Sequence, residues 1–455
     1  MKTRMNFKDE FYQKLKLLVL PIAIQNFMLA LVSATDAIML GWIDQTSLSA
    51  VSLAGQVQFV LSLFISGIAA GAGIMAAQYW GKRDAASIEK VIPIALRTNL
   101  LFSGLFTILA GFCPEILMRI FTNDAALVAS GSQYLRAVAL SYVLCGISQV
   151  YLILLKNTGH AAVSSRISST AVVLNIILNA ILIYGLCGAP ALGIRGAAYA
   201  TVAARVVELI WAYLETKKPE RVRILWNRLF SSAGKILSED FWRYTLPVLA
   251  ASLVWGIAYV LYSVIMGHMG SDAVAANSIT SIAKSLLSCL IRGVSGGAGV
   301  LIGNLLGANE LEKAREYGGR LSHLSIAIGI VTGGLLMLIS PAIVHFAPLS
   351  DTAAEYLQYM LLFCGLNLMA QSVNTTVLDG IFCAGGDAKF DMQGNIGAMW
   401  CFSVPLGFLA AFWLKLPVMV VYCIVNLDEI VKLPAVYHHY KKYIWVRNIT
   451  RDVEE

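Results

Sequence analysis

Long stretches without a single charged residue restrict what this sequence can fold into. Ala50 to Tyr79 contains no Asp, Glu, Lys or Arg, and neither does Ile22 to Ala34. An α-helix rises 1.5 Å per residue, so about 20 apolar residues cross the hydrocarbon core of a bilayer. Over the whole chain 58% of residues are hydrophobic and 13% are charged, whereas soluble domains have about 45–50% and about 25%. The sequence therefore predicts an all-α integral membrane protein.

Apolar stretches that alternate with charged loops predict about twelve transmembrane helices. An even number of spans places both termini on the same side of the membrane. The predicted spans are 17–41, 50–77, 91–112, 132–155, 167–187, 194–214, 244–268, 274–303, 321–346, 354–380, 394–414 and 416–434.

The basic residues predict the orientation of these spans. Most of the 34 Lys and Arg residues lie at the two termini and in the even-numbered loops, while the odd-numbered loops hold Arg119, Arg195 and Lys415. Basic loops stay in the cytoplasm, so we expect a multi-pass protein of the cell membrane with both termini cytoplasmic. A basic rim against anionic lipid accounts for the net charge of +7, and no nucleic-acid partner is expected.

The longest hydrophilic stretch lies in the middle of the chain and divides it into two halves. We expect an N-terminal six-helix lobe at 1–214, a cytoplasmic linker at 215–243, a C-terminal six-helix lobe at 244–434 and a cytoplasmic tail at 435–455. Shifting the sequence by 226 positions aligns the halves without a gap over some sixty residues. The aligned pairs include Pro21 with Pro247, Gly41 with Gly267, Gly71 with Gly297, and Gly81 with Gly307.

This repeat predicts two pseudo-symmetric lobes. Because each half has six spans, both halves begin on the same side, and the repeat is parallel, about an axis along the membrane normal. Transporters built this way usually bind their substrate between the repeats and rock one repeat against the other.

Four segments carry a resemblance to a known family: 36–41 (DAIMLG), 78–84 (QYWGKRD), 303–308 (GNLLGA) and 384–388 (AGGDA). In their order, spacing and twelve-span frame they resemble the multidrug and toxic compound extrusion (MATE) family. The resemblance covers essentially the whole chain. It implies two six-helix lobes that export small compounds, often cationic and amphipathic, in exchange for H⁺ or Na⁺.

Three residues of the first half are candidates for ion coupling. Asp36 lies inside the first span, where a carboxylate is costly to bury, and the resemblance implies that it couples ion movement to export. Asn175 and Asn179 are four residues apart and share one helix face; some members of the family carry an aspartate where Asn179 stands. The alternatives are that Asp36 is a structural or interfacial acid and that the asparagines only hold helices together.

The second half departs from the family pattern. The positions where NorM-type members carry acids are Trp255 and the vicinity of Ser372, so a NorM-like Na⁺ site there is doubtful, and Asp379 is expected to be the only acid deep in this half. Lys284 and Arg292, two helical turns apart, make a basic stripe that must face the bundle interior or water. They are either a structural pair, for example with Asp379, or contacts for an anionic or zwitterionic substrate.

Further polar and aromatic residues at helical spacing are candidates for a substrate cavity. An aromatic stripe such as that of the seventh span is more often packing or lipid contact than the wall of a binding site. Arg205 and Glu208 are expected to neutralise each other. The predicted cavity residues are Gln25, Gln58, Ser62, Trp255, Tyr259, Tyr262, Lys284, Arg292, Asn367, Gln371 and Asn374.

Nothing in the sequence predicts an enzyme, a metal site or a cofactor. No P-loop pattern is present, and the eight cysteines show no metal-ligand spacing. The leading hypothesis is an antiporter, monomeric, whose partners are a small-molecule substrate, a coupling ion (H⁺ or Na⁺) and the lipid bilayer. A flippase or exporter of an anionic lipid-linked or zwitterionic substrate is the alternative, and a channel or receptor is a third.

Overall fold

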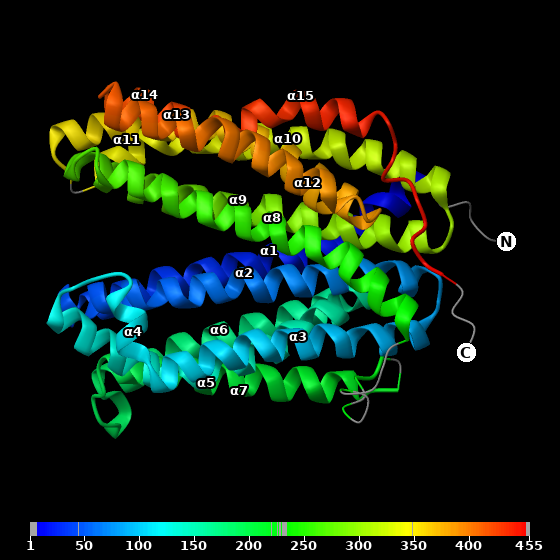
Figure 1. Cartoon of the computed structure of the whole chain (residues 1–455), viewed down its shortest axis with the longest axis horizontal. Coiled ribbons are helices and arrows are strands. Elements are labelled where there is room, and N and C mark those ends of the chain that lie inside the picture. Colours follow the sequence, from blue (N-terminus) through cyan, green and yellow to red (C-terminus); the bar gives the residue numbers. More distant parts are fainter. Residues whose placement is uncertain are drawn as a thin grey trace. The chain divides into compact units, whose positions relative to one another are not determined.

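The apolar runs of the sequence form helices, and no strand occurs among the residues that the structure describes. This computed structural model describes residues 7–43, 45–219, 221–224, 226, 229, 234–347 and 349–451. Figure 1 labels helices of the first half. The elements of this half are α1 (Phe7–Gly41), α2 (Gln45–Gly81), α3 (Ala85–Phe112), α4 (Pro114–Arg119), α5 (Ala125–Leu155), η1 (Lys156–His160), α6 (Ala161–Tyr184), η2 (Leu186–Gly188) and α7 (Ile194–Thr216).

The second half repeats this organisation. Its last spans are broken into shorter pieces, some of them π-helical. The elements are α8 (Lys235–Gly267), α9 (Ser271–Gly307), α10 (Leu311–Phe346), α11 (Asp351–Thr375), η4 (Thr376–Phe382), α12 (Ala388–Asn395), η5 (Ile396–Ser403), α13 (Val404–Phe408), η6 (Leu409–Trp413), α14 (Val418–Val425) and α15 (Asp428–Tyr440).

The helices account for the twelve predicted spans. By length and apolar composition, ten stretches of the described residues can cross a membrane. One of them, Ala125–Tyr184, has 60 residues and contains two helices, because the backbone leaves helical geometry at Thr158 and Gly159. The short helices α14 and α15 follow one another at the position of the last predicted span. The protein is therefore a multi-pass membrane protein, and the all-α prediction is confirmed.

The two halves repeat each other closely in backbone structure. Helices α2 and α9 begin at Gln45 and Ser271 and end at Gly81 and Gly307, each pair 226 residues apart. The turn after each helix contains a non-glycine residue in the left-handed region, Arg83 at φ 64° and Asn309 at φ 61°, again 226 apart. The predicted internal repeat is thus present in the local geometry.

The chain packs into two units whose limits do not follow the halves of the sequence. One unit is Ile24–Leu249, and the other combines residues 7–23 with 250–451. Helices α1 and α8 therefore each change unit part-way along, two residues after Pro21 and Pro247, which lie inside them. The predicted limits 1–214, 215–243, 244–434 and 435–455 stay a prediction, and the packing units differ from them in these two helix segments.

Two glycines of α2 explain why residues 235–249 of α8 pack within the unit 24–249. Gly67 and Gly71 lie one turn apart on α2, and a Cβ at Gly71 would lie 2.2 Å from Thr245 Oγ1 and 2.7 Å from Thr245 Cα. A Cβ at Gly67 would lie 2.9 Å from Leu249 Cα. Two glycines four residues apart let helix backbones approach closely, and here they admit the α8 backbone.

The same arrangement recurs in the other unit with the same sequence offset. A Cβ at Gly293 would lie 2.6 Å from Ala23 Cβ, and a Cβ at Gly297 would lie 2.8 Å from Val19 Cγ2. Each pair of contacts is the other displaced by 226 residues. The first segments of α1 and α8 are therefore exchanged reciprocally, and the glycine stripes of α2 and α9 receive them.

The C-terminal segment after α15 is part of the core of its unit. Trp445 is fully buried, together with Phe11, Leu306 and Phe382. Arg447 donates through Nε to Gly385 O (2.7 Å) and through Nη2 to Gly386 O (2.6 Å). Burial raises the pKa of Tyr440, which stacks on Trp445, to about 12. This segment holds the turn between η4 and α12 in place.

Candidate ion and substrate sites

Asp36 belongs to a chain of polar side chains inside the unit 24–249. Asn179 Nδ2 donates to Asp36 Oδ1 at 2.6 Å and to Asn175 Oδ1 at 3.3 Å. Asn175 Nδ2 in turn donates to Thr201 Oγ1 at 3.3 Å. The structure therefore brings the three predicted ion-coupling residues together, from α1 and α6, and adds Thr201 of α7.

One oxygen atom of this hydrogen-bonded chain of side chains has no partner. Asn179 is completely buried and Asn175 is 6% exposed, and Asn179 Oδ1 has no hydrogen-bond partner. An unpaired buried amide oxygen is costly, and it lies on the side chain that also contacts a carboxylate. Carboxylate, amide and hydroxyl oxygens are the donors that hard cations prefer, and a carboxylate also accepts a proton. These oxygen atoms could therefore bind either H⁺ or Na⁺.

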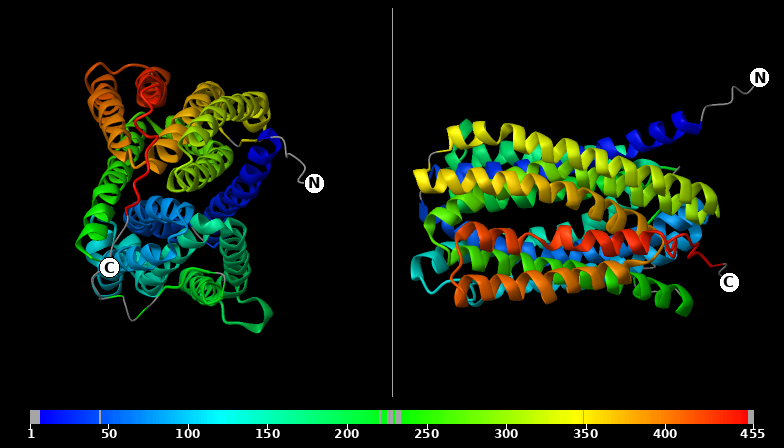
Figure 2. Two further views of the ribbon diagram at one scale, coloured as in Figure 1. Left: turned by 90° about the vertical axis from the view of Figure 1, so that its right-hand side faces the viewer. Right: turned by 90° about the horizontal axis from the view of Figure 1, so that it is seen from above.

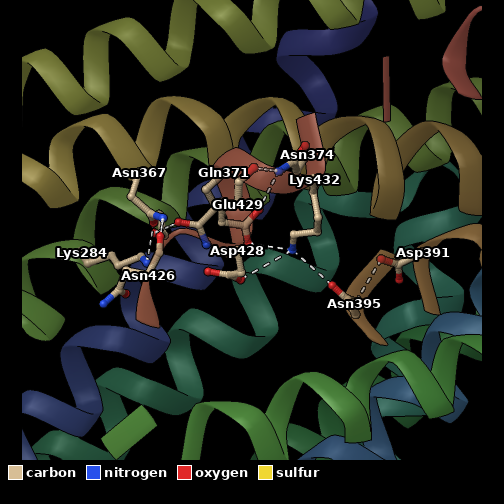
Figure 3. Close-up of polar contacts among 11 residues, drawn as sticks. Lys284, Asn367, Gln371, Asn374, Asp391, Asn395, Asn426, Asp428, Glu429 and Lys432 are labelled. Atoms are coloured by element: carbon tan, nitrogen blue, oxygen red, sulfur yellow. Dashed lines mark hydrogen bonds and ion pairs between the residues drawn. The ribbon is translucent and has the colours of Figure 1, made fainter. Parts of the chain in front are cut away.

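Two helices of the other unit are joined by a polar ladder. Lys284 Nζ on α9 donates to Asn367 Oδ1 on α11 at 2.8 Å, and Asn367 Nδ2 donates to Asn426 O at 2.7 Å. One turn further along, Ser288 Oγ donates to Gln371 Oε1 at 3.5 Å. Each side-chain pair is 83 residues apart, so the two helices run in the same direction. Figure 3 shows the contact between Lys284 and Asn367.

The predicted pairing of the basic stripe takes a different form. Lys284 contacts an amide rather than Asp379. Arg292 is exposed, and no ion pair of it occurs among the described residues. In the part of the chain that the structure describes, neither Lys284 nor Arg292 therefore has a carboxylate in direct contact.

Helix α15 carries a buried charge cluster that the sequence analysis missed. Lys432 Nζ lies 3.2 Å from Glu429 Oε1 and 3.8 Å from Asp428 Oδ2, and it donates to Asn395 Oδ1 at 3.2 Å. Asn395 Nδ2 donates to Asp391 Oδ1 at 3.1 Å. Figure 3 shows these side chains converging from α12 and α15.

The expectation that Asp379 is the only deep acid of this half is wrong. Asp391, Asp428 and Glu429 are 6%, 6% and 9% exposed, whereas Asp379 itself is exposed. Asn374, a predicted cavity residue, donates through Nδ2 to Glu429 Oε2 at 2.8 Å. The signal in the sequence was a Lys three and four residues after two acids, a spacing that brings the side chains onto one helix face.

The aromatic residues of α8 differ in how far they are buried. Trp255 stacks on Tyr259, with ring centroids 5.6 Å apart, and Tyr259 is 44% exposed. Tyr262 is turned into the core beside Ile265 and Val421. Trp255 and Tyr259 are thus at least partly exposed, whereas Tyr262 is part of the buried core.

The remaining predicted cavity residues lie in the unit 24–249, and among the residues that the structure describes they form no hydrogen bond with one another. Gln25 and Gln58 are half-buried and Ser62 is exposed, and Ser62 Oγ donates to its own helix at Phe59 O, 2.6 Å away. Arg205 forms the expected ion pair with Glu208 at 2.9 Å.

Comparison with known proteins shows which family has this repeat. The MatE family model matches residues 21–181 and again 247–409, so its two copies start at Pro21 and Pro247 and follow the internal repeat. The chain belongs to the MatE family. This is a family of multidrug efflux transporters, not of enzymes, and the family resemblance is confirmed.

Relatives of the MatE chain match it over most of their length. "Uncharacterized transporter YisQ" of Bacillus subtilis is 21% identical over 94% of this chain and 93% of its own. "Probable multidrug resistance protein NorM" of Thermotoga maritima is 23% identical over 90% of this chain and 87% of its own.

Solved structures of MatE-like transporters share the fold. One, described as an outward-facing multidrug resistance MATE family transporter of the MOP superfamily, superposes with a TM-score of 0.81 at 19% identity, covering 95% of each chain. Another, from Pyrococcus furiosus, superposes with a TM-score of 0.85 at 20% identity, covering 95% of each chain, and its description reports reverse polarity of the binding pocket.

Proposed function

We propose that the protein is an ion-coupled antiporter that exports small amphipathic or cationic compounds by alternating access. The observation that carries this proposal is the chain from Asp36 through Asn179 and Asn175 to Thr201, with a free buried amide oxygen at Asn179. The protein lies in the cell membrane with both termini in the cytoplasm, because the basic loops lie on that side.

Asn179 suits both states of a coupling carboxylate. An amide donates through its nitrogen to a charged carboxylate, and after a half-turn it accepts through its oxygen from a protonated one or ligates a cation. Ion binding at Asp36 removes or compensates a buried charge. Coupling follows when the ion and the substrate each bind the inward-facing and outward-facing states with different affinity.

The test is transport in inverted membrane vesicles under imposed gradients. Uptake of a cationic dye is followed by fluorescence under a proton gradient, a sodium gradient, or neither. Asp36→Asn keeps the size and the hydrogen bonding of the side chain but cannot change charge, and it is expected to abolish gradient-driven uptake while the protein still inserts and folds. Asp351→Asn, an exposed acid in the first turn of α11, is the matched control. Unchanged dye uptake by Asp36→Asn removes this residue from the mechanism.

A second candidate function is export or flipping of an anionic or zwitterionic lipid-linked compound. It is favoured by Lys284 and Arg292, which have no carboxylate in direct contact among the described residues. The reverse pocket polarity reported for the Pyrococcus furiosus protein is a further reason to test it. In the same vesicles, cationic-dye uptake gained by the variant Lys284→Met with Arg292→Met favours an anionic natural substrate.

A further inference from the structure

The ammonium of Lys432 lies among oxygen atoms of the kinds that bind metal cations in proteins. Its side chain is 5% exposed, and its ammonium is surrounded by Glu429 Oε1 at 3.2 Å, Asn395 Oδ1 at 3.2 Å and Asp428 Oδ2 at 3.8 Å. The oxygens come from two different elements, α12 and α15 (Figure 3). Carboxylates and a side-chain amide around a positive charge are the donor set of a hard-cation site.

Each unit contains a cluster of carboxylate and amide oxygens, and the two clusters differ in whether a lysine lies among them. In the unit 24–249, Asp36, Asn179 and Asn175 provide carboxylate and amide oxygens, and no lysine contact to Asp36 occurs among the described residues. In the other unit, comparable oxygens converge on a lysine of the protein itself. Lys284, which donates to Asn367, lies within electrostatic range of both Asp428 and Glu429.

Other groups with charge or titratable protons lie near this cluster. Asp379 interacts electrostatically with Asp391, Glu429 and Lys432, and also with Arg292 of α9. Tyr262 of α8 lies within electrostatic range of Asp428 and Glu429. The carboxylates nearest to Lys432 are compensated by lysines, and the space between their oxygens is filled by an ammonium.

We propose that Lys432 is a tethered cation that permanently fills the oxygen-lined position between α12 and α15. The unit of residues 7–23 and 250–451 therefore takes up no free cation, and the exchanged ion binds only at Asp36. The occupancy of the site rests on the contacts of Lys432 alone. The restriction of coupling to Asp36 rests on the function proposed above.

A purely structural role of Lys432 and a role as a tethered cation lead to different expectations for the stability of a protein without this lysine. If Lys432 only stabilises the fold, its loss leaves buried carboxylates and a weaker protein, whatever salt is present. If Lys432 stands in for a cation, its loss opens a site that free Na⁺ can enter, and the protein gains stability as Na⁺ rises.

The experiment measures thermal unfolding of the purified full-length protein in detergent, by tryptophan fluorescence, as NaCl replaces choline chloride at constant ionic strength. All variants carry Asp36→Asn, so the first site cannot respond. Asp36→Asn alone is expected to show no specific Na⁺ effect. Adding Lys432→Gln is expected to make the unfolding temperature rise with Na⁺, by roughly equal increments for each tenfold increase in Na⁺ above the dissociation constant. Lys432→Arg keeps a cation in place and is the matched control, expected to stay unresponsive.

Two results overturn the proposal. One is a folded Asp36→Asn, Lys432→Gln protein whose unfolding temperature does not respond to Na⁺. The other is an equal response to Na⁺ in the Asp36→Asn protein that still has Lys432. Should the double variant fail to fold, adding Asp428→Asn removes the excess charge and leaves Glu429 and Asn395 as ligands. A Na⁺ response of that triple variant supports the proposal, and its absence overturns it. No transport is measured, so this result is independent of whether dye export is ion-coupled.

Discussion

Glu208 is one of the most deeply buried acids among the described residues, and its partners show how the fold tolerates it. Its side chain is 1% exposed, accepts from Arg205 Nη1 at 2.9 Å and accepts from Ser148 Oγ at 2.6 Å. A buried ion pair contributes little net stability, but removing one partner leaves an uncompensated charge.

We therefore expect Arg205→Leu to destabilise the protein by about 3–5 kcal/mol, and the double variant Arg205→Leu, Glu208→Leu to recover most of that loss. Thermal or chemical unfolding of the purified protein measures both. A double variant as unstable as the single one contradicts this account, because the loss would then come from packing rather than from charge.

At the scale of single residues, the sequence allowed part of the site to be predicted. Asp36, Asn175 and Asn179 were recognisable because polar residues are rare inside spans, and the structure brings them into contact. The cluster around Lys432 was missed because its residues stand at the end of the last predicted span, where charged side chains ordinarily reach water. Its partners on α12 come from a different span, and only the fold shows which spans are neighbours.

At the scale of helices, the glycine stripes of α2 and α9 decide which segments pack together. The contact at Gly71 involves the backbone of Thr245 as well as its side chain. Backbone atoms cannot rotate away from an added side chain, so space at this position is not recoverable by a rotamer change. Gly55, on the same helix, has nothing within 4 Å of an added Cβ.

Gly71→Val is expected to destabilise the unit 24–249 by about 1–3 kcal/mol or more, because of overpacking against α8. Gly55→Ala is the matched control and is expected to be neutral or slightly stabilising, since alanine favours the helix by about 0.5–1 kcal/mol. Unfolding temperatures of the two variants are compared with the parent protein. Equal behaviour of both variants argues against close packing at Gly71.

The helices themselves were predictable, but their partners were not. Hydropathy located the ten stretches of the described residues that are long and apolar enough to cross a membrane, because the bilayer requires about 20 apolar residues for each crossing. The repeat of 226 residues also appeared in the sequence. The exchange of the first segments of α1 and α8 did not, because a pattern along one helix gives its apolar character and not the identity of the helix that covers it.

At the scale of the whole molecule, each packing unit is completed by a segment that the sequence separates from most of it. Residues 7–23 are grouped with 250–451, and residues 235–249 are grouped with the helices that precede them. Figure 2 gives two further views in which the course of these helices can be followed by colour. Neither half of the sequence, cut at the linker, contains a complete unit.

A chain cut once between Thr216 and Lys235 is therefore expected to form a stable protein only when both fragments are present. Each fragment made alone lacks the segment that fills its glycine stripe and is expected to be degraded or to aggregate. Co-expression followed by affinity purification of one tagged fragment measures the assembly. A single fragment that purifies as a stable, monodisperse protein contradicts the exchange.

The exchange of helix segments also sets a timetable for biosynthesis. Residues 7–23 leave the ribosome first, but the glycines that receive them, Gly293 and Gly297, are translated far later. At about 5–20 residues per second, the first helix waits on the order of tens of seconds in the membrane with its packing face unoccupied. In the nascent protein, residues 7–23 therefore lack their packing partner until α9 has been translated. The unit that contains them is the first to begin and the last to be completed.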